Sequence, residues 1–370
     1  MYRVLKFIWQ SLTNAMADEY EETITERQKR ILAIIIRDYI ENAQPVGSQR
    51  LVEAYGVDAS PATVRNEMAF LTQKGYLKQP HTSAGRVPTE KGFRFFVRHL
   101  MGQVDLPLSV QRTITHQFHQ TRPDLDSWMR LAVSVLANQS QSAALVTSPH
   151  PHQSLFKHLS LISTSGRQVL MVLVLVGGEV KQQMLFLAEP TSQEQLSYTA
   201  KSLTEAFEGC DAYAIRQKST NLTALEQDIT KLILEELERS ASLLGGEIYR
   251  DGLSNILAEP EFAESGAARR ALRILEERSL LENLLSRIVL STKVGGVHVI
   301  IGGEGAWEEL RECSIVLARY GIPNFLTGIL GVLGPIRMPY GPTISSVRFI
   351  ANVLSNLVTD TYAEQEKLNL

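Results

Sequence analysis

The sequence predicts an α+β protein that begins with a winged helix-turn-helix and continues into a strand-rich domain interrupted by a helical insertion. Residues 25–102 follow the pattern helix, helix, helix, hairpin, helix. Strand-like segments then fall on both sides of a mostly helical stretch, as expected for an interrupted α+β domain. The chain has 370 residues, whereas one domain typically has roughly 100–200. We therefore expect an extension at 1–24, a winged helix at 25–102, a strand-rich domain in two parts at 103–195 and 291–370, and an insert at 196–290.

The overall composition is that of an ordinary globular protein. Hydrophobic residues make up 44% of the chain and charged residues 21%, which excludes a largely disordered chain, a collagen-like fibre and a long coiled coil. No apolar run approaches the ~18–20 residues that span a bilayer. The two cysteines, Cys210 and Cys313, are too few for a disulfide framework or a four-cysteine zinc site. We expect both to be buried or inert.

The net charge of −3 hides an uneven distribution. Between Thr25 and Leu100, twelve Lys and Arg residues outnumber seven Asp and Glu residues, so this segment carries +5. The first 24 residues carry −2 and residues 101–370 carry −6. A basic N-terminal domain on an acidic body is typical of a nucleic-acid-binding module.

The first 24 residues resemble an export signal only weakly. Arg3 and Lys6 precede apolar residues, but Lys6 and Gln10 interrupt the apolar stretch. An acidic run, DEYEE, stands where a cleavage site would be expected. We therefore expect a dispensable N-terminal extension.

Local signals mark the first two helices of the basic segment. Thr25 and Gln28 match a capping box before the apolar stripe of ERQKRILAIIIRDYI. The sequence Asn42-Ala-Gln-Pro45 ends that helix. Ser48 then caps a short helix, QRLVEAY, which stops at Gly56.

The third helix and the hairpin have equally clear boundaries. Ser60 and Pro61 suit a helix cap and first position, and Gly75 suits the end of the helix. The segment GYLKQPHTSAGRVPT alternates around a Ser-Ala-Gly turn, which predicts a hairpin, and another helix follows from Thr89. The short connection between the second and third helices is the one a helix-turn-helix requires.

The third helix carries the candidate base-reading residues. At 100° per residue, one apolar face falls inward, Asn66 points to the opposite side and Arg65 lies on a flank. Arginine pairs with guanine and asparagine with adenine through two hydrogen bonds each. Ser60 and Thr63 lie on the first turn, which suits contact with a phosphate. The alternative is that Arg65 and Asn66 are ordinary solvated helix residues.

The hairpin tip HTSAGR holds small residues between His81 and Arg86. Small side chains let backbone N–H groups approach phosphates, and an arginine can enter a minor groove. His81 is equally explained as a plain loop histidine, and we do not expect it to act as a pH switch.

Beyond residue 102, the strand-like segments are AALVTS, FKHLSLIST, RQVLMVLVLV, EVKQQMLFLAE, GGVHVIIGG, CSIVLARYG and GILGVLGPIRM. The run VLMVLVLV suits a buried central strand. The segment IYRDGLSNILAEPEF looks helical with a proline-marked end, and a final helix is predicted over TISSVRFIANVLSNLVTDTYA.

Other chemical signals are weak. The glycines of VIIGGEG lack the lysine and spacing of a phosphate-binding loop. The histidine pairs His116/His119 and His150/His152 lack the further ligands of a zinc site. We find no catalytic constellation, and we expect no metal, no cofactor and no enzymatic activity.

Three long strings carry a family resemblance: PVGSQ, SPATVRNEM and HTSAGRVPTEKG. With IYRDGLSNILAEPEF and GVLGPIRMPYGPTISSV, they make residues 25–370 closely resemble the heat-inducible transcription repressor HrcA family. That resemblance implies a GAF-like domain interrupted by an inserted dimerisation domain. It also implies a cytoplasmic homodimer that represses chaperone operons at an inverted-repeat operator, with a chaperonin partner that keeps it active and no membrane contact.

Within this chain, the resemblance places the DNA contacts on the recognition helix and the wing. The candidate residues are Ser48, Gln49, Ser60, Thr63, Arg65, Asn66, His81, Thr82, Ser83, Gly85 and Arg86. A second hypothesis stays open: a ligand-gated regulator whose GAF-like domain senses a small metabolite. A stoichiometric small molecule in native mass spectrometry would favour that second hypothesis.

Overall fold

The computed structural model describes residues 24–81, 84–102, 104–151, 154–176, 178–220, 222–240, 246–262, 265–289, 293–302, 308–323 and 325–368. The predicted N-terminal extension therefore lies outside the described residues, apart from Ile24. The chain divides into two compact units, 1–103 and 104–370. In the described part of the chain, no helix is long and apolar enough to cross a membrane.

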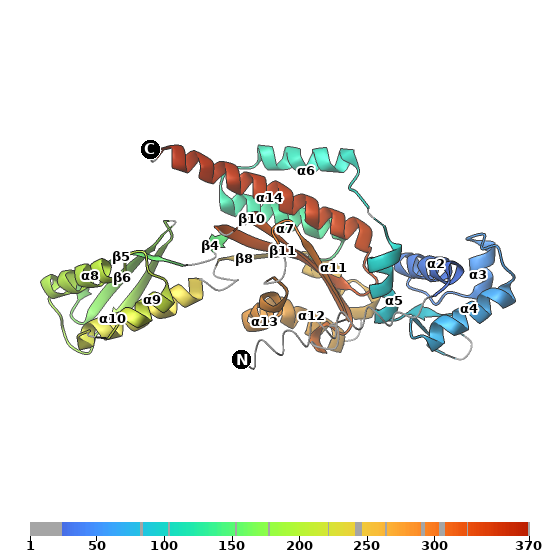
Figure 1. The fold of residues 1–370 in the computed structure, drawn as a ribbon, viewed down its shortest axis with the longest axis horizontal. Helices are drawn as coiled ribbons and strands as arrows, with labels where there is room; N and C mark the ends of the chain where they lie inside the picture. The colour runs from blue at the N-terminus through green and yellow to red at the C-terminus, as the bar shows by residue number, and fades with distance from the viewer. Residues whose placement is uncertain are drawn as a thin grey trace. The chain divides into compact units, whose positions relative to one another are not determined.

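The first unit is the predicted winged helix-turn-helix. Thr25 and Gln28 form the predicted capping box, Ser60 caps the third helix, and Thr89 caps the helix after the hairpin. Figure 1 shows the three blue helices grouped together. In chain order the elements are α2 (Glu26–Asn42), α3 (Ser48–Glu53), α4 (Pro61–Gln73), β1 (Leu77–Lys78), β2 (Val87–Pro88), α5 (Glu90–Phe95) and the π-helical turn η1 (Phe96–Leu100).

An apolar core holds these helices together. The α2 stripe predicted from the sequence is buried, and Val64, Met68 and Leu71 of α4 are buried as predicted. Phe93 and Phe96, which follow the hairpin, are also buried. The third helix is therefore held by its apolar face, which leaves its polar side to solvent.

The second unit is built on an antiparallel sheet in the order β8-β3-β11-β10-β9, with β4 also paired to β11. Its strands are β3 (Ala143–Thr147), β4 (His150–Pro151), β8 (Ile248–Asp251), β9 (Val297–Ile301), β10 (Cys313–Ile322) and β11 (Leu326–Pro335). The accompanying helices are α6 (Leu108–Gln120), α7 (Leu125–Ser140), α11 (Leu253–Leu257), η2 (Pro260–Phe262), α12 (Ser265–Glu276), α13 (Arg278–Val289), η4 (Glu308–Leu310) and α14 (Tyr340–Leu368). Strands far apart in sequence thus form one sheet, and the strand-rich domain is interrupted as predicted.

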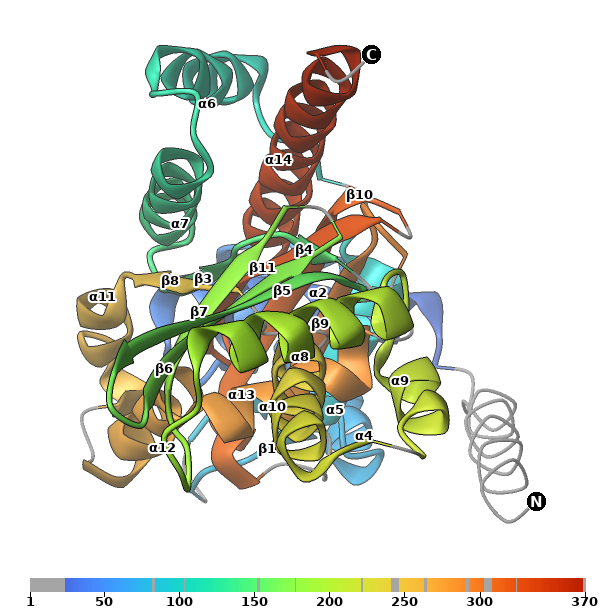
Figure 2. The ribbon, with the colours of Figure 1, turned by 90° about the vertical axis from the view of Figure 1, so that its left-hand side faces the viewer.

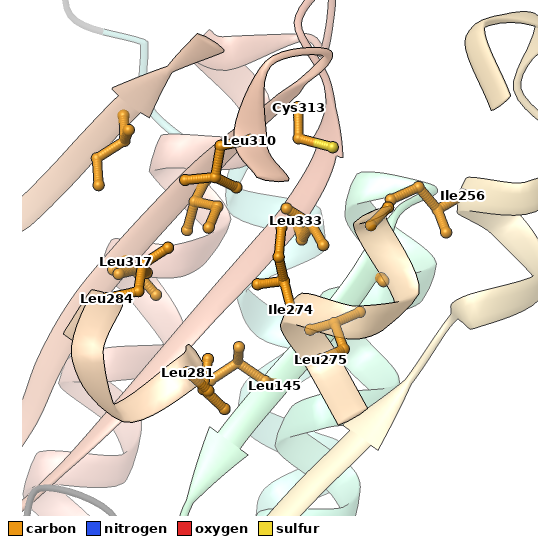
Figure 3. Close-up of a cluster of buried hydrophobic side chains, with 14 of the residues drawn as sticks. Leu145, Ile256, Ile274, Leu275, Leu281, Leu284, Leu310, Cys313, Leu317 and Leu333 are labelled. Atoms are coloured by element: carbon orange, nitrogen blue, oxygen red, sulfur yellow. The ribbon is translucent and has the colours of Figure 1, made fainter. Parts of the chain in front are cut away.

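Helices cover both faces of this sheet. Successive strand residues point to opposite sides, so each strand contributes side chains to both faces. Leu317 of β10 belongs to an apolar cluster with α12 and α13, and Figure 3 shows this cluster. Its neighbours on β10 face the other way: Ser314 shares a 2.7 Å hydrogen bond with the Tyr340 hydroxyl of α14, and the Tyr320 hydroxyl lies 3.0 Å from the Met129 sulfur of α7.

The insert has its own core. Strands β5 (Phe156–Ser165), β6 (Gln168–Leu175) and β7 (Val180–Phe186) form a three-stranded antiparallel sheet. One apolar cluster joins this sheet to α8 (Gln193–Phe207), α9 (Ala212–Lys218) and α10 (Ala224–Ser240). Figure 2 shows α8 running along the sheet. The residues that share this core run from 156 to 237, whereas the sequence predicted an insert at 196–290 from the change to helical periodicity. Helices α11 to α13 pack instead in the core of the larger sheet.

Two local expectations differ from the structure. Residues 248–251, predicted as helical, form strand β8, which pairs with β3, and Gly252 at φ 75° separates it from the short α11. Pairing with β3 satisfies the backbone of β8, and this non-local contact outweighs the local periodicity. The run predicted as a buried central strand, β6, is central but alternates between buried and half-buried residues. Among the described residues, helices α8 to α10 share a core with the buried face of this sheet.

Candidate nucleic-acid interface

The exposed side of α4 presents the predicted base-reading residues together. Arg65 and Asn66 are exposed, with the small residues Ala62 and Ala69 exposed beside them. The buried face of the same helix is apolar. An exposed polar side flanked by small residues allows a close approach to the edges of bases in a major groove.

Most backbone N–H groups in the first turn of α4 already donate hydrogen bonds within the helix cap. The Ser60 hydroxyl accepts the N–H of Thr63 at 3.1 Å and lies 2.9 Å from the Thr63 hydroxyl. Val64 donates its N–H to the Ser60 carbonyl, and Pro61 has no N–H. Ser60 and Thr63 therefore maintain the start of the helix, and few donors of this turn remain for the phosphate contact expected from the sequence.

The wing is joined to the turn that precedes α3. Strands β1 and β2 pair Lys78 with Val87, and the backbones of Arg86 and Val46 exchange two hydrogen bonds of 2.9 Å. Gly85 allows this close approach, because a Cβ atom there would lie 2.4 Å from the Val46 carbonyl oxygen. The glycine of the predicted hairpin is thus required by contact between the wing and the helix-turn-helix.

Arg86 is tied to the recognition helix. Its Nε donates to the Thr72 hydroxyl of α4 at 3.0 Å, and that hydroxyl donates to the Met68 carbonyl at 2.8 Å. The side chain is half-buried. We predicted an arginine that inserts into a minor groove; the structure shows an arginine that also braces the hairpin against α4.

A polar hollow of about 410 Å³ lies between the start of α3, the side of α4 and the wing. Four predicted residues line it: Ser48, Arg65, Gly85 and Arg86. Ser48 is 8% exposed, so it lies at the buried inner wall of the hollow. The remaining lining residues are Gly47, Met68, Gln79 and Ala84. Two guanidinium groups and a hydroxyl at one hollow suit an anionic group such as a phosphate.

Sequence reasoning missed Gln79, whose side-chain amide donates to the Ala84 carbonyl across the hairpin at 3.1 Å. Its position directly after Lys78, which pairs with Val87 next to Arg86, was the available signal. The other predicted residues lie outside the hollow: Gln49 is exposed and donates to Glu53 at 2.7 Å, and His81 is exposed at the turn. Thr82 and Ser83 fall outside the described residues.

A buried carboxylate on α2 holds α3 in place. Asp38 is 2% exposed and accepts hydrogen bonds from Arg50 at 2.7 and 2.8 Å, from the Tyr55 hydroxyl at 2.8 Å and from Asn42 at 2.7 Å. The Arg50 hydrogen bond, helped by those from Tyr55 and Asn42, keeps the pKa of Asp38 below its usual value despite burial.

A second carboxylate, that of Glu67, attaches α4 to α2. Glu67 of α4 accepts from Gln28 and Arg27 of α2, each at 2.8 Å. The hydrogen bond from Gln28, followed by the contribution of Arg27, lowers the pKa of Glu67. Helix α2 is therefore the frame to which both helices of the helix-turn-helix are attached.

Ion pairing decides where the positive charge of this unit remains available. Among the described residues, its ion pairs include Arg27 with Glu67, Lys29 with Glu26, Arg50 with Asp38 and Arg94 with Glu90. Arg65 on α4 and Lys78 on the wing are exposed, and so are Arg30 and Arg37 on α2. Exposed positive charge therefore lies on α4 and the hairpin and also on α2.

Neither cysteine belongs to this surface. Both are buried as predicted, and burial raises the pKa of the Cys313 thiol to about 12. Among the described residues, no group of three or more His, Cys, Asp or Glu is placed to hold a metal ion.

Comparison with known proteins agrees with this architecture. The family model described as "HrcA protein C terminal domain" matches residues 126–344. A heat-inducible transcription repressor HrcA of Herpetosiphon aurantiacus is 44% identical over 350 residues, which cover 93% of this chain and 98% of the relative. One from Roseiflexus castenholzii is 42% identical, covering 92% and 96%. A crystal structure described as a hypothetical protein is 25% identical with a TM-score of 0.53, covering 91% and 98%.

Proposed function

This chain belongs to the HrcA family of heat-inducible transcription repressors, and from that premise we propose that it represses chaperone operons by binding operator DNA through α4 and the wing. The observation that carries the proposal is the exposed pair Arg65 and Asn66 on α4, beside a polar hollow bounded by the wing. Helix α4 would enter the major groove of an inverted-repeat operator. The hollow would receive a backbone phosphate, which fixes the register of the helix on the duplex.

An alanine substitution tests this assignment. If Arg65 reads a base, Arg65→Ala weakens operator binding by roughly 1–3 kcal/mol and relaxes specificity at one position. The measurement is a gel shift with fragments upstream of the organism's chaperone operons, compared with random duplex. The control is Arg30→Ala, which removes an exposed cation from α2. Unchanged operator affinity would contradict base reading, and an equal loss on random DNA would identify a phosphate contact instead.

We propose that two copies associate through the open face of the β5–β6–β7 sheet. Adjacent positions in the register place Ile162, Leu170 and Met184 in one row across the three strands. Ile162 is 45% exposed, Met184 47%, and Phe186 at the end of the same face 73%. A contiguous exposed apolar patch of this kind marks an interaction site. A two-fold dimer matches an inverted-repeat operator, and the interface then uses the strands of the insert as well as the helical block expected from the sequence.

Heat control follows from mass action in this proposal. Heating populates partly unfolded repressor, and unfolded clients occupy the chaperonin that would otherwise refold it, so that less repressor binds its operator. The support for this mechanism is the family membership. Depleting free chaperonin at constant temperature is expected to relieve repression. Repression that persists unchanged would contradict the chaperonin link.

We further propose a cytoplasmic protein without enzymatic activity. Repression of this kind requires only reversible occupancy of DNA. Because four cations of the DNA-binding unit are ion-paired within it, we expect moderate salt-dependent attraction to bulk DNA. Discrimination would then depend on the base contacts of α4 and on the spacing of the two half-sites.

A further inference from the structure

We propose that Glu67 is a positioning residue for base reading, because hydrogen bonds from α2 to its carboxylate set the rotation of α4 about its axis. The inference rests on the proposed DNA-binding function of α4. Glu67 directly follows Asn66 and stands two residues after Arg65. Each residue step turns a helix by 100°, so a fixed direction for Glu67 fixes the directions of both candidate base contacts.

Both carboxylate oxygens of Glu67 are engaged by α2. Gln28 donates its side-chain N–H to Oε2 at 2.8 Å, and Arg27 Nε donates to Oε1 at 2.8 Å. The Glu67 side chain is 12% exposed, whereas that of Arg27 is 57% exposed. The inward face of α4 is held by aliphatic contacts, which are not directional. The paired hydrogen bonds to Glu67 supply the directionality that those contacts lack.

Gln28 performs two tasks with one amide group. Its Oε1 accepts the backbone N–H of Thr25 at 2.9 Å, which completes the capping box of α2, while its nitrogen donates to Glu67. Either Glu or Gln serves the capping box at this position. Only Gln can also donate to a carboxylate, because an ionised Glu is an acceptor alone. Gln at position 28 is therefore the residue that can both complete the capping box and donate a hydrogen bond to Glu67.

The same chemistry allows an exchange that keeps every partner. In the double variant Gln28→Glu/Glu67→Gln, the new carboxylate at position 28 accepts from the Thr25 N–H and from the new amide at position 67. The amide oxygen at position 67 still accepts from Arg27. The double variant also has the charge of the original chain, whereas the single variants differ from it by −1 for Gln28→Glu and +1 for Glu67→Gln.

The test measures the affinity of the full-length chain and of these three variants for two duplexes of equal length. One carries the region upstream of the organism's chaperone operon, and the other is a scrambled sequence. We expect each single substitution to lower the affinity ratio between the two duplexes about tenfold, within the coupling range of contacting polar groups. On scrambled DNA alone, Gln28→Glu should bind more weakly and Glu67→Gln more tightly, following their charges. The double variant should recover the original ratio.

A role confined to stability predicts another pattern. The single variants would melt earlier, but the affinity ratio of the folded fraction would not change. That result, or a ratio that the exchange fails to recover, would overturn the positioning role. If the original chain itself bound both duplexes equally, the proposed DNA-binding function would fail and this inference with it. Discrimination that survives both single substitutions would overturn this inference alone.

Discussion

Replacing the buried Asp38 by asparagine should loosen α3 selectively. The Asp38 carboxylate accepts four hydrogen bonds of 2.7–2.8 Å, two of them from Arg50. Asparagine preserves the volume but loses the charge and one acceptor oxygen. Hydrogen bonds to charged groups contribute roughly 1.5–3 kcal/mol, and the released donors regain water at the surface. We therefore expect the local stability of α3 to fall by about 2 kcal/mol.

Hydrogen exchange of the full chain measures this loss where it occurs. A fall of about 2 kcal/mol corresponds to roughly 30-fold faster opening of α3 amides. Peptides from residues 104–370 form a separate compact unit and serve as the internal control. Equal exchange of α3 in both proteins would refute the claim that Asp38 holds α3. Faster exchange in both units would show a global effect instead.

The pH dependence supplies an independent check of the same clamp. The Arg50 hydrogen bond lowers the folded-state pKa of Asp38, so its stabilisation is complete above the unfolded value of about 3.9 and is lost as the pH falls through the folded pKa. In the original chain, the protection of α3 amides from hydrogen exchange should therefore fall as the pH drops below about 4, after correction for intrinsic exchange rates. Asp38→Asn should show a flatter profile there. Identical profiles would contradict a depressed pKa at this carboxyl group.

The other predictions concern the dimer and the wing. Phe186→Glu should convert a dimer into monomers in light scattering, because it places a charge on the open sheet face; Tyr198→Glu, on the helix α8 that covers the other face and 75% exposed, should not. Gly85→Ala should weaken operator binding at least tenfold by separating the wing from the helix-turn-helix, and unchanged binding would show that the contact is dispensable. Thr72→Val should free the Arg86 guanidinium and lower operator affinity about threefold in a titration, whereas tighter binding would show that the tie restrains Arg86.

The local structure around the candidate site was largely predictable because its elements follow local rules. The cap at Ser60, the apolar face of α4 and the glycine of the hairpin are each signalled by a few neighbouring residues. The partners of these residues were not predictable. Nothing in the spacing of Arg86 and Thr72, or of Gln28 and Glu67, shows that the members of each pair meet. Those contacts join segments that only the packed fold brings together.

By itself, the sequence determined most of the elements of this protein and their order, because caps, helical periodicity and turn residues act over a few positions. It identified the winged helix, the alternation of strands and the acidic body. The tertiary structure alone decided that residues 248–251 join a sheet as β8, and that strands 156–186 share a core with α8 to α10. Both depend on hydrogen bonds and apolar burial between residues distant in the chain, which local periodicity does not encode.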